Sequence, residues 1–170
     1  MMRLPAFTYA APRTIAEAAR ILAGEGPRAM LVAGGTDLYP NMKRRQQNPR
    51  VVIGLRGIPE LSGVAGSPKT GLSVGACTTL TDLSAHCLVL ESYPALARAV
   101  RTISTPILRN MGTIGGNICL DTRCNYYDQN YEWRRAINFC MKCDGDTCWV
   151  APSSRICLAV NSSDSVPLLC

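Results

Sequence analysis

Apolar residues in the first third of the chain form two kinds of pattern, one typical of helices and one typical of buried strands. Residues 14–24 (TIAEAARILAG) place them every three or four positions, which predicts an amphipathic helix, and Thr14 followed by Glu17 is typical of a capping box. AMLVAGG (29–35) and RVVIGL (50–55) are short continuous apolar runs, as in buried strands. TDLYPNMKRR (36–45) predicts a turn and a short helix between them. This strand and helix alternation favours a small parallel sheet.

The pattern changes after residue 57, and we expect one lobe over 1–57 and a second over 58–170. GLSVGACTTL (71–80) predicts a strand with one exposed face, and 81–89 and 93–103 predict helices. Residues 104–119 hold so many Gly, Pro and Asn that we expect a structured loop that enters a strand. SVPLLC at the end of the chain predicts the start of an apolar helix, so the chain is expected to be a C-terminally truncated fragment.

Composition and charge exclude several classes of protein. Hydrophobic residues make up 47% of the chain, and no apolar run approaches the ~20 residues of a membrane helix. The N-terminal MMRLPAFTYAAPRT lacks the apolar core of a signal peptide, so we expect a cytoplasmic protein. The net charge of +6 rests on small clusters (43–45, 134–135) without an aromatic-rich basic face. We therefore expect no nucleic acid partner, but a solvated surface or a docking patch for an acidic protein.

Two glycine-rich segments are candidates for ligand binding. LVAGGTDL (31–38) and GTIGGNI (112–118) each place a Gly-Gly pair at a predicted strand boundary, where backbone amides can approach a phosphate. Neither is the G-x-G-x-x-G fingerprint or a Walker loop. Two interpretations of these segments remain open. They are either two structural turns or the parts of one site that bind the two ends of a pyrophosphate.

LVAGGTDL, TPILRNMGTIGGN and SDSVPLL, in this order, resemble the FAD-binding subunits of the molybdenum hydroxylases, which include the flavoprotein parts of xanthine and carbon monoxide dehydrogenases. The resemblance implies the fold class α+β, with a two-lobed FAD-binding fold of the p-cresol methylhydroxylase type. It also implies a family subunit that continues well beyond residue 170. The residues that match the family's FAD contacts are Leu31, Val32, Ala33, Gly34, Gly35, Thr36, Asp37, Leu38, Ile103, Thr113, Gly115, Gly116, Asn117 and Asp164. Asp164 is expected to accept a hydrogen bond from a ribityl or ribose hydroxyl; a helix cap is its alternative role.

The cysteines cluster in a segment that the rest of the family mostly lacks. Five of the nine lie within 122–157, and we expect an insert over about 119–160. A cysteine cluster in a chain without a secretion signal indicates metal binding. Only Cys140 and Cys143 form a close pair, so spacing alone leaves an iron–sulfur cluster, zinc and unligated thiols open.

Within the family, the insert (GGNICLDTRCNYYDQNYEWRRAINFCMK and CWVAPSSRICLAVNSSD) resembles that of the 4-hydroxybenzoyl-CoA reductase flavoprotein subunits, which holds a [4Fe-4S] cluster. The ligands that this resemblance implies are Cys124, Cys140, Cys148 and Cys157, while Cys143 matches a variable position. The other thiols are expected to be small buried residues: Cys77, Cys87, Cys119 and Cys170. Five aromatic residues are expected to pack around the cluster: Tyr126, Tyr127, Tyr131, Trp133 and Trp149. Arg134 and Arg135 are expected to be solvated or to face an acidic donor.

The resemblance implies an electron-transfer subunit with FAD and one [4Fe-4S] cluster. Its implied partners are a molybdopterin-containing large subunit, a small subunit with two [2Fe-2S] clusters, and reduced ferredoxin as donor for the dehydroxylation of 4-hydroxybenzoyl-CoA to benzoyl-CoA. One alternative is the flavoprotein subunit of an aldehyde, xanthine or carbon monoxide type hydroxylase that passes electrons outward. Another is a zinc-stapled binding domain without redox activity. No catalytic residue is expected on this chain, and His86 is expected on a helix surface.

Overall fold

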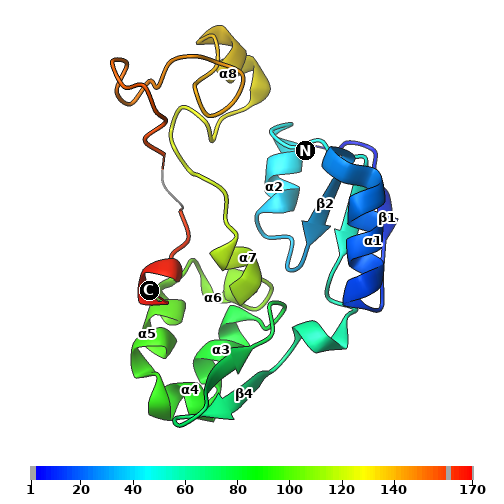
Figure 1. Cartoon of the computed structure of the whole chain (residues 1–170), viewed down its shortest axis with the longest axis vertical. Helices are drawn as coiled ribbons and strands as arrows, with labels where there is room; N and C mark the ends of the chain where they lie inside the picture. The colour runs from blue at the N-terminus through cyan, green and yellow to red at the C-terminus, as the bar shows by residue number, and fades with distance from the viewer. Residues whose placement is uncertain (1–2, 160–161, 170) are drawn as a thin grey trace.

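The computed structural model describes residues 3–159 and 162–169. Its first part is a three-stranded parallel sheet with strand order β1-β3-β2 (Figure 1). β2 (Ala29–Val32) and β3 (Val51–Gly54) confirm the two predicted strands and their parallel pairing. β1 (Thr8–Ala10) was not predicted, because three residues of mostly exposed edge strand carry no apolar period.

Two helices cover opposite faces of this sheet, because neighbouring residues of the central strand β3 point to opposite sides. Val52 packs in a cluster with Met42 of α2 (Leu38–Lys43), whereas Ile53 packs with Ala18 of α1 (Ile15–Glu25). Thr14 caps α1 by accepting a hydrogen bond from the Glu17 N–H at 3.1 Å. The predicted amphipathic helix is therefore confirmed, and it ends at Glu25, one residue after the expected end at Gly24. A 3₁₀ turn, η1 (Gly26–Arg28), leads from it into β2.

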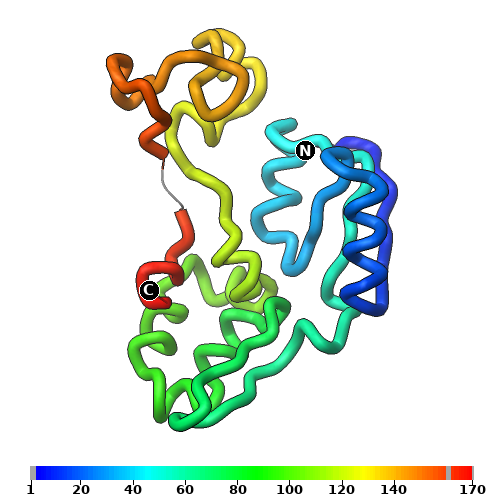
Figure 2. The backbone as a smooth tube through the Cα atoms, in the orientation of Figure 1, coloured from blue at the N-terminus to red at the C-terminus, as the bar shows by residue number. Residues whose placement is uncertain are grey.

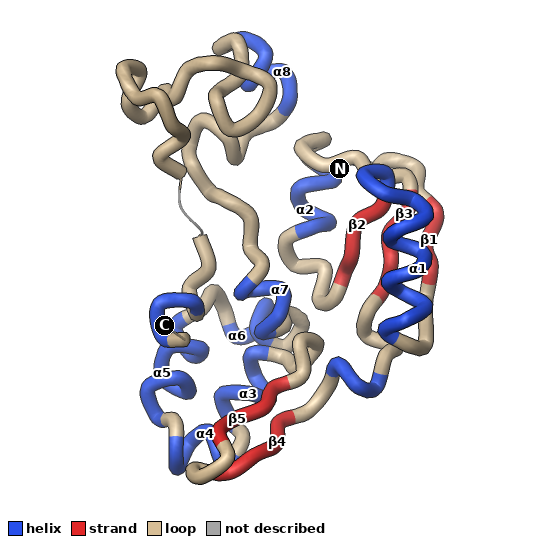
Figure 3. Tube along the Cα trace, in the orientation of Figure 1, coloured by secondary structure: helices blue, strands red, loops and turns tan. Residues whose placement is uncertain are grey.

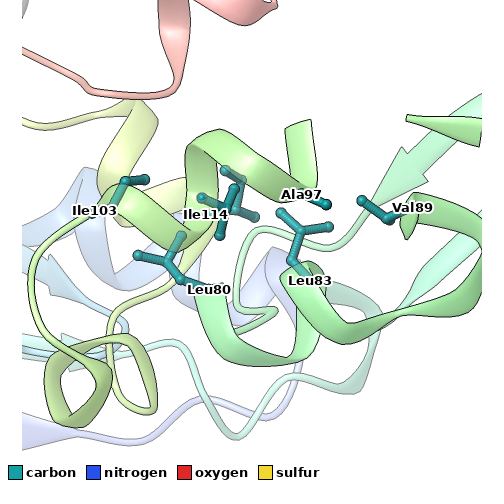
Figure 4. Packing of buried hydrophobic residues seen from close by; sticks show 7 residues of the cluster. Leu80, Leu83, Val89, Ala97, Ile103 and Ile114 are labelled. Carbon is teal, nitrogen blue, oxygen red and sulfur yellow. The ribbon is translucent and has the colours of Figure 1, made fainter. Parts of the chain in front are cut away.

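The second part begins with η2 (Pro59–Leu61) and a two-stranded antiparallel hairpin of β4 (Val64–Ser67) and β5 (Gly71–Val74). Three helices follow: α3 (Leu80–Ala85), α4 (Cys87–Ser92) and α5 (Pro94–Thr102). The single helix predicted over 81–89 is wrong, because His86 adopts an extended backbone (φ −67°, ψ 130°) that separates α3 from α4. This break lets side chains from both helices reach one core with α5 (Figure 4).

Residues 104–119 form two short helices, α6 (Pro106–Arg109) and α7 (Ile114–Ile118), and not a loop that enters a strand. Thr105 and Thr113 cap them by accepting hydrogen bonds from the N–H groups of Leu108 and Gly116. The caps and the fixed φ of Pro106 offset the low helix propensity of Gly and Asn in this stretch. The second Gly-Gly pair therefore lies inside the first turn of a helix and not at a strand boundary.

The predicted insert lies apart from the helices of the second core, at the end of the run of chain that leaves α7 (Figure 2). Apart from α8 (Tyr131–Ala136), its described residues form turns and loops (Figure 3). The chain returns to α5 through η3 (Val166–Leu168), which agrees with the helical start predicted there. Among the described residues, no helix has the length and apolar character that crossing a bilayer requires.

Candidate functional site

The two glycine segments, far apart in sequence, pack directly against each other. A Cβ atom on Gly34 would lie 1.9 Å from the carbonyl oxygen of Met111. One on Gly112 would lie 3.5 Å from Oγ1 of Thr36. Gly34 is therefore required for the contact between the two segments, which the sequence interpretation did not foresee. That both segments belong to one ligand site stays a prediction.

The first glycine segment presents unpaired backbone donors. Within the described residues, the N–H groups of Gly34, Gly35 and Thr36 donate to no protein acceptor. Gly35 takes a left-handed conformation (φ 73°), which any other residue would adopt with strain. Consecutive free N–H groups in such a turn form a concave anion site. The segment thus has the chemistry of a phosphate cradle.

The second glycine segment has its own amides engaged. The Ile114 N–H donates to the carbonyl of Thr78 at 3.0 Å, and the Gly115 N–H to that of Ala76 at 2.9 Å. A Cβ on Gly115 would lie 2.7 Å from Ala76, so this glycine too serves close backbone packing. The second segment can therefore support a ligand through its side chains and its surface, whereas the first supplies amide donors.

Asn117 connects the second segment to the end of the insert. Its Nδ2 donates to Oδ2 of Asp164 at 3.1 Å, and its Oδ1 accepts from Oγ of Ser165 at 2.6 Å. Asp164 remains exposed, and it does not cap η3, since the Val166 N–H donates to Oγ of Ser163 instead. The alternative role of Asp164 as a helix cap is therefore wrong. Its carboxylate lies beside Asn117 and is accessible to a ligand hydroxyl.

Three of the predicted FAD contacts are core residues. Val32 and Leu38 pack in the cluster under the sheet, and Ile103 packs in the core of the second part at 7% exposure (Figure 4). Their side chains offer little surface to a ligand. Leu31, by contrast, is 44% exposed on β2. The accessible part of the first segment is accordingly Leu31 together with residues 33–37.

Four thiols of the insert line one cavity. They are the predicted ligand set, Cys124, Cys140, Cys148 and Cys157, and Cys143 is not among the lining residues. None of the four is in a disulfide, and Cys140 and Cys148 are buried. The fold therefore brings together, at one cavity, thiols from a segment of 34 residues.

Backbone amides stabilise the sulfur atoms of this cavity. The amides of Leu158 and Ala151 hydrogen-bond Cys148 and lower the pKa of its thiol. The Ala159 N–H donates to Sγ of Cys157 at 3.4 Å. Thiolates are the form that binds metal, and such hydrogen bonds also tune iron–sulfur centres. Among the described residues, no three potential metal-binding side chains converge closely enough to hold a single ion.

The remaining sulfur atoms differ partly from expectation. Cys143 lies outside the cavity, where its Sγ accepts from Nη1 of Arg134 at 3.4 Å and donates to Asp144 at 3.2 Å. Burial is the main cause that raises the pKa of the Cys143 thiol. Cys77 is buried as expected, but Cys87 and Cys119 are exposed, since neither lies on an inward helix face. Cys170 lies outside the described residues.

Other predicted features of the insert are only partly confirmed. Three aromatic residues line the cavity, whereas Tyr131 and Trp133 stack on other rings: the lining residues are Tyr126, Tyr127 and Trp149. Arg134 is not a solvated residue; it is 7% exposed, and its guanidinium lies 6.0 Å from the Tyr127 ring centroid. His86 occupies the junction of α3 and α4 with a buried, unpaired Nδ1, and not a helix surface.

The sequence interpretation missed two ion pairs between the insert and the first part. Arg123 donates to Asp37 at 2.6 Å, and Arg44 to Asp128 at 3.0 Å. More than eighty residues of chain separate the partners of each pair. No local pattern marks such pairs, because they depend on the path of the whole chain.

The parallel-sheet lobe carries an amide cradle, packs against the second lobe through the two glycine segments, and is joined by ion pairs to the segment that holds the thiol-lined cavity. Residues 5–170 match the family model described as the FAD binding domain in molybdopterin dehydrogenase. The chain belongs to this family.

Its relatives include the carbon monoxide dehydrogenase medium chain of Hydrogenophaga pseudoflava, 41% identical over 114 residues (67% of this chain and 39% of the relative). The aldehyde oxidoreductase FAD-binding subunit PaoB of Escherichia coli is 35% identical over 166 residues, or 95% of this chain and 52% of the relative. A solved structure of the Hydrogenophaga pseudoflava carbon monoxide dehydrogenase that lacks the Mo-pyranopterin moiety matches with a TM-score of 0.65 at 40% identity. That match covers 69% of this chain and 40% of the other. The chain thus spans two fifths to one half of these relatives.

The extents of the two sequence matches differ in an informative way. The match to the carbon monoxide dehydrogenase chain leaves a third of this chain uncovered. The match to the aldehyde oxidoreductase subunit leaves out only 5%, so it must run through most of the cysteine segment. The matched range of at least one relative, which is named as an aldehyde oxidoreductase subunit, therefore extends across most of the cysteine segment.

Proposed function

We propose that this protein acts in the FAD-binding, electron-transfer subunit of an enzyme of the molybdenum hydroxylase family. The observation that carries the proposal is the row of unpaired amides at Gly34–Thr36, packed against the capped start of α7. FAD would supply reversible electron transfer. Substrate chemistry would take place on a partner subunit, and this chain would bind and orient the flavin cofactor.

The residues of the two glycine segments suit different parts of FAD. The free N–H groups of Gly34, Gly35 and Thr36 would hold the pyrophosphate. The Asp164 carboxylate, held by Asn117, would accept a hydrogen bond from a ribityl or ribose hydroxyl. Thr113 and Gly116 would lie against the flavin side of the pyrophosphate. In this proposal the lobes are 1–57 and 58–170, and the ligand contacts both.

We further propose that the cysteine cavity holds a [4Fe-4S] cluster on Cys124, Cys140, Cys148 and Cys157. A donor set of thiolates alone, with hydrogen bonds to sulfur and an apolar aromatic wall, is typical of such clusters. Zinc in a structural site needs four ligands at about 2.3 Å from one point. The four thiols line one cavity. The resemblance of the insert to a cluster-holding segment supports the cluster over structural zinc.

The direction of electron flow follows best from the relatives. Their names, carbon monoxide dehydrogenase, aldehyde oxidoreductase and xanthine dehydrogenase, favour a subunit that passes electrons outward from a substrate. Its partners would be a molybdopterin-containing large subunit and a small subunit with two [2Fe-2S] clusters. The second candidate is 4-hydroxybenzoyl-CoA reductase, with ferredoxin as donor, and the cysteine insert is the feature that supports it. Because the aldehyde oxidoreductase match also covers that insert, the insert does not favour the reductase by itself.

Iron and flavin analysis of the anaerobically purified protein tests the cofactor assignment. We expect Cys148→Ser to lose most of the bound iron and to keep bound FAD, because the two sites use separate residues. Cys143→Ser is the matched control and should keep both, since its sulfur lies outside the cavity. A wild-type protein that contains zinc and no iron would refute the cluster, and one that takes up no FAD would refute the flavin site.

A further inference from the structure

A continuous chain of polar contacts links the cysteine insert to the helix after the first glycine segment. The Arg123 guanidinium donates to Oδ1 of Asp37 at 2.6 Å, and Oδ2 of Asp37 accepts from Nδ2 of Asn41 at 3.1 Å. Oδ1 of Asn41 accepts from Arg44 at 2.5 Å, and Arg44 also donates to Asp128 at 3.0 Å. We call these five residues the clasp. Both of its ends lie in the insert, and its middle lies on or beside α2.

The clasp reaches the anion site through Asp37. This residue directly follows the free N–H groups at 34–36 in the chain, so its carboxylate adds a negative charge to the segment where a pyrophosphate would bind. A like charge at that position opposes anion binding. Asn41, only 7% exposed, fixes one oxygen of the carboxylate, and Arg123 neutralises the other.

The Arg123–Asp37 pair is partly exposed, so we expect it to affect ligand binding more than folding stability. The two side chains are 53% and 37% exposed, and exposed ion pairs contribute little to folding stability. The pair places a positive charge from the insert beside an anion site of the first lobe. Its main consequence is therefore electrostatic and concerns the ligand.

We propose that Arg123 is a positioning residue for the first glycine segment: it holds and neutralises Asp37, so that the cysteine insert contributes to FAD affinity. This inference rests on the proposed function, because it takes the pyrophosphate of FAD as the anion. It links the two cofactor regions, because removing this arginine of the insert weakens FAD binding at the first glycine segment.

FAD titration of the protein, followed by flavin fluorescence at low ionic strength, tests the proposal. We expect Arg123→Gln to raise the dissociation constant of FAD about fivefold, the upper range for one exposed charge pair. Asp37→Asn in the same chain should return the constant to within about twofold of wild type, because no carboxylate is then left to neutralise. The increase should shrink at 0.5 M salt, since salt screens exposed charges.

Lys43→Gln is the matched control, because it removes one positive charge from α2 without breaking the clasp, and it should leave the constant unchanged. A loss in Arg123→Gln that Asp37→Asn does not rescue would mean that the pair matters only for structure, and would overturn the proposal. Equal affinity of Arg123→Gln and wild type would overturn it as well while leaving the flavin site intact. A wild-type protein that binds no FAD would refute the proposed function and this inference together. Circular dichroism of each variant confirms that it is folded.

Discussion

Replacing Gly34 by alanine tests whether the two glycine segments meet as described. The added Cβ would lie 1.9 Å from the Met111 carbonyl oxygen and 2.7 Å from its carbon, whereas ordinary contact begins at 3.4 Å. The two backbones would have to separate by roughly 1.5 Å, the difference between 1.9 and 3.4 Å. Neither partner is a flexible side chain, and the φ of Gly34 is not positive, so the cost comes from packing alone.

Overpacking of this kind costs about 1–3 kcal/mol, and we expect Gly34→Ala to destabilise the protein by the upper part of that range. Urea denaturation followed by circular dichroism measures it. We also expect FAD affinity to fall at least tenfold, because the amide cradle moves away from α7. Gly24→Ala is the control: it lies in α1 with no atom within 4 Å of the new Cβ, and should stabilise by about 0.5–1 kcal/mol. Equal stability of Gly34→Ala and wild type would refute the packing of the two segments.

Two further predictions concern the end of the insert and the free thiols. Asn117→Leu removes the acceptor for Ser165 Oγ and the donor to Asp164. We expect it to lower the free energy of unfolding, measured by urea denaturation, by about 2–3 kcal/mol. A loss below about 0.5 kcal/mol would show that Asn117 does not hold the returning chain. Burial raises the pKa of the Cys77 thiol, which lowers its thiolate fraction at pH 8. We expect buried Cys77 to react with iodoacetamide at least tenfold more slowly than exposed Cys87. The rate at Cys77 should rise as the pH increases. Peptide mass spectrometry measures both rates, and equal rates would contradict the burial of Cys77.

Local patterns predicted the elements whose residues share one strong signal. The run at 51–54 is apolar on both faces because β3 is the central strand, and Thr14 with Glu17 marked the start of α1. The same reasoning failed at 104–119, where low helix propensity suggested a loop and two threonine caps produce helices instead. A cap adds about 1 kcal/mol at one residue, which a composition argument over sixteen residues does not detect.

Spacing of the cysteines left the ligand set open, and it drew attention to the pair Cys140 and Cys143. The four-cysteine set came from the family resemblance, and the folded insert places those four at one cavity. Cys143 turns the other way, toward Arg134 and Asp144. Which face of a loop a thiol takes depends on backbone geometry that spacing in an irregular segment does not encode.

The sequence by itself determined the parallel lobe, the two glycine segments and the positions of the thiols, because these depend on residue type and near neighbours. Only the tertiary structure decided that Gly34 meets Met111 and that Arg123 pairs with Asp37. Such contacts join residues some eighty positions apart, and any one of them depends on every turn of the chain between its partners. The amides at 34–36 that find no acceptor among residues 3–159 and 162–169 are likewise a property of the fold, since such an N–H group stays free only when no other described segment reaches it.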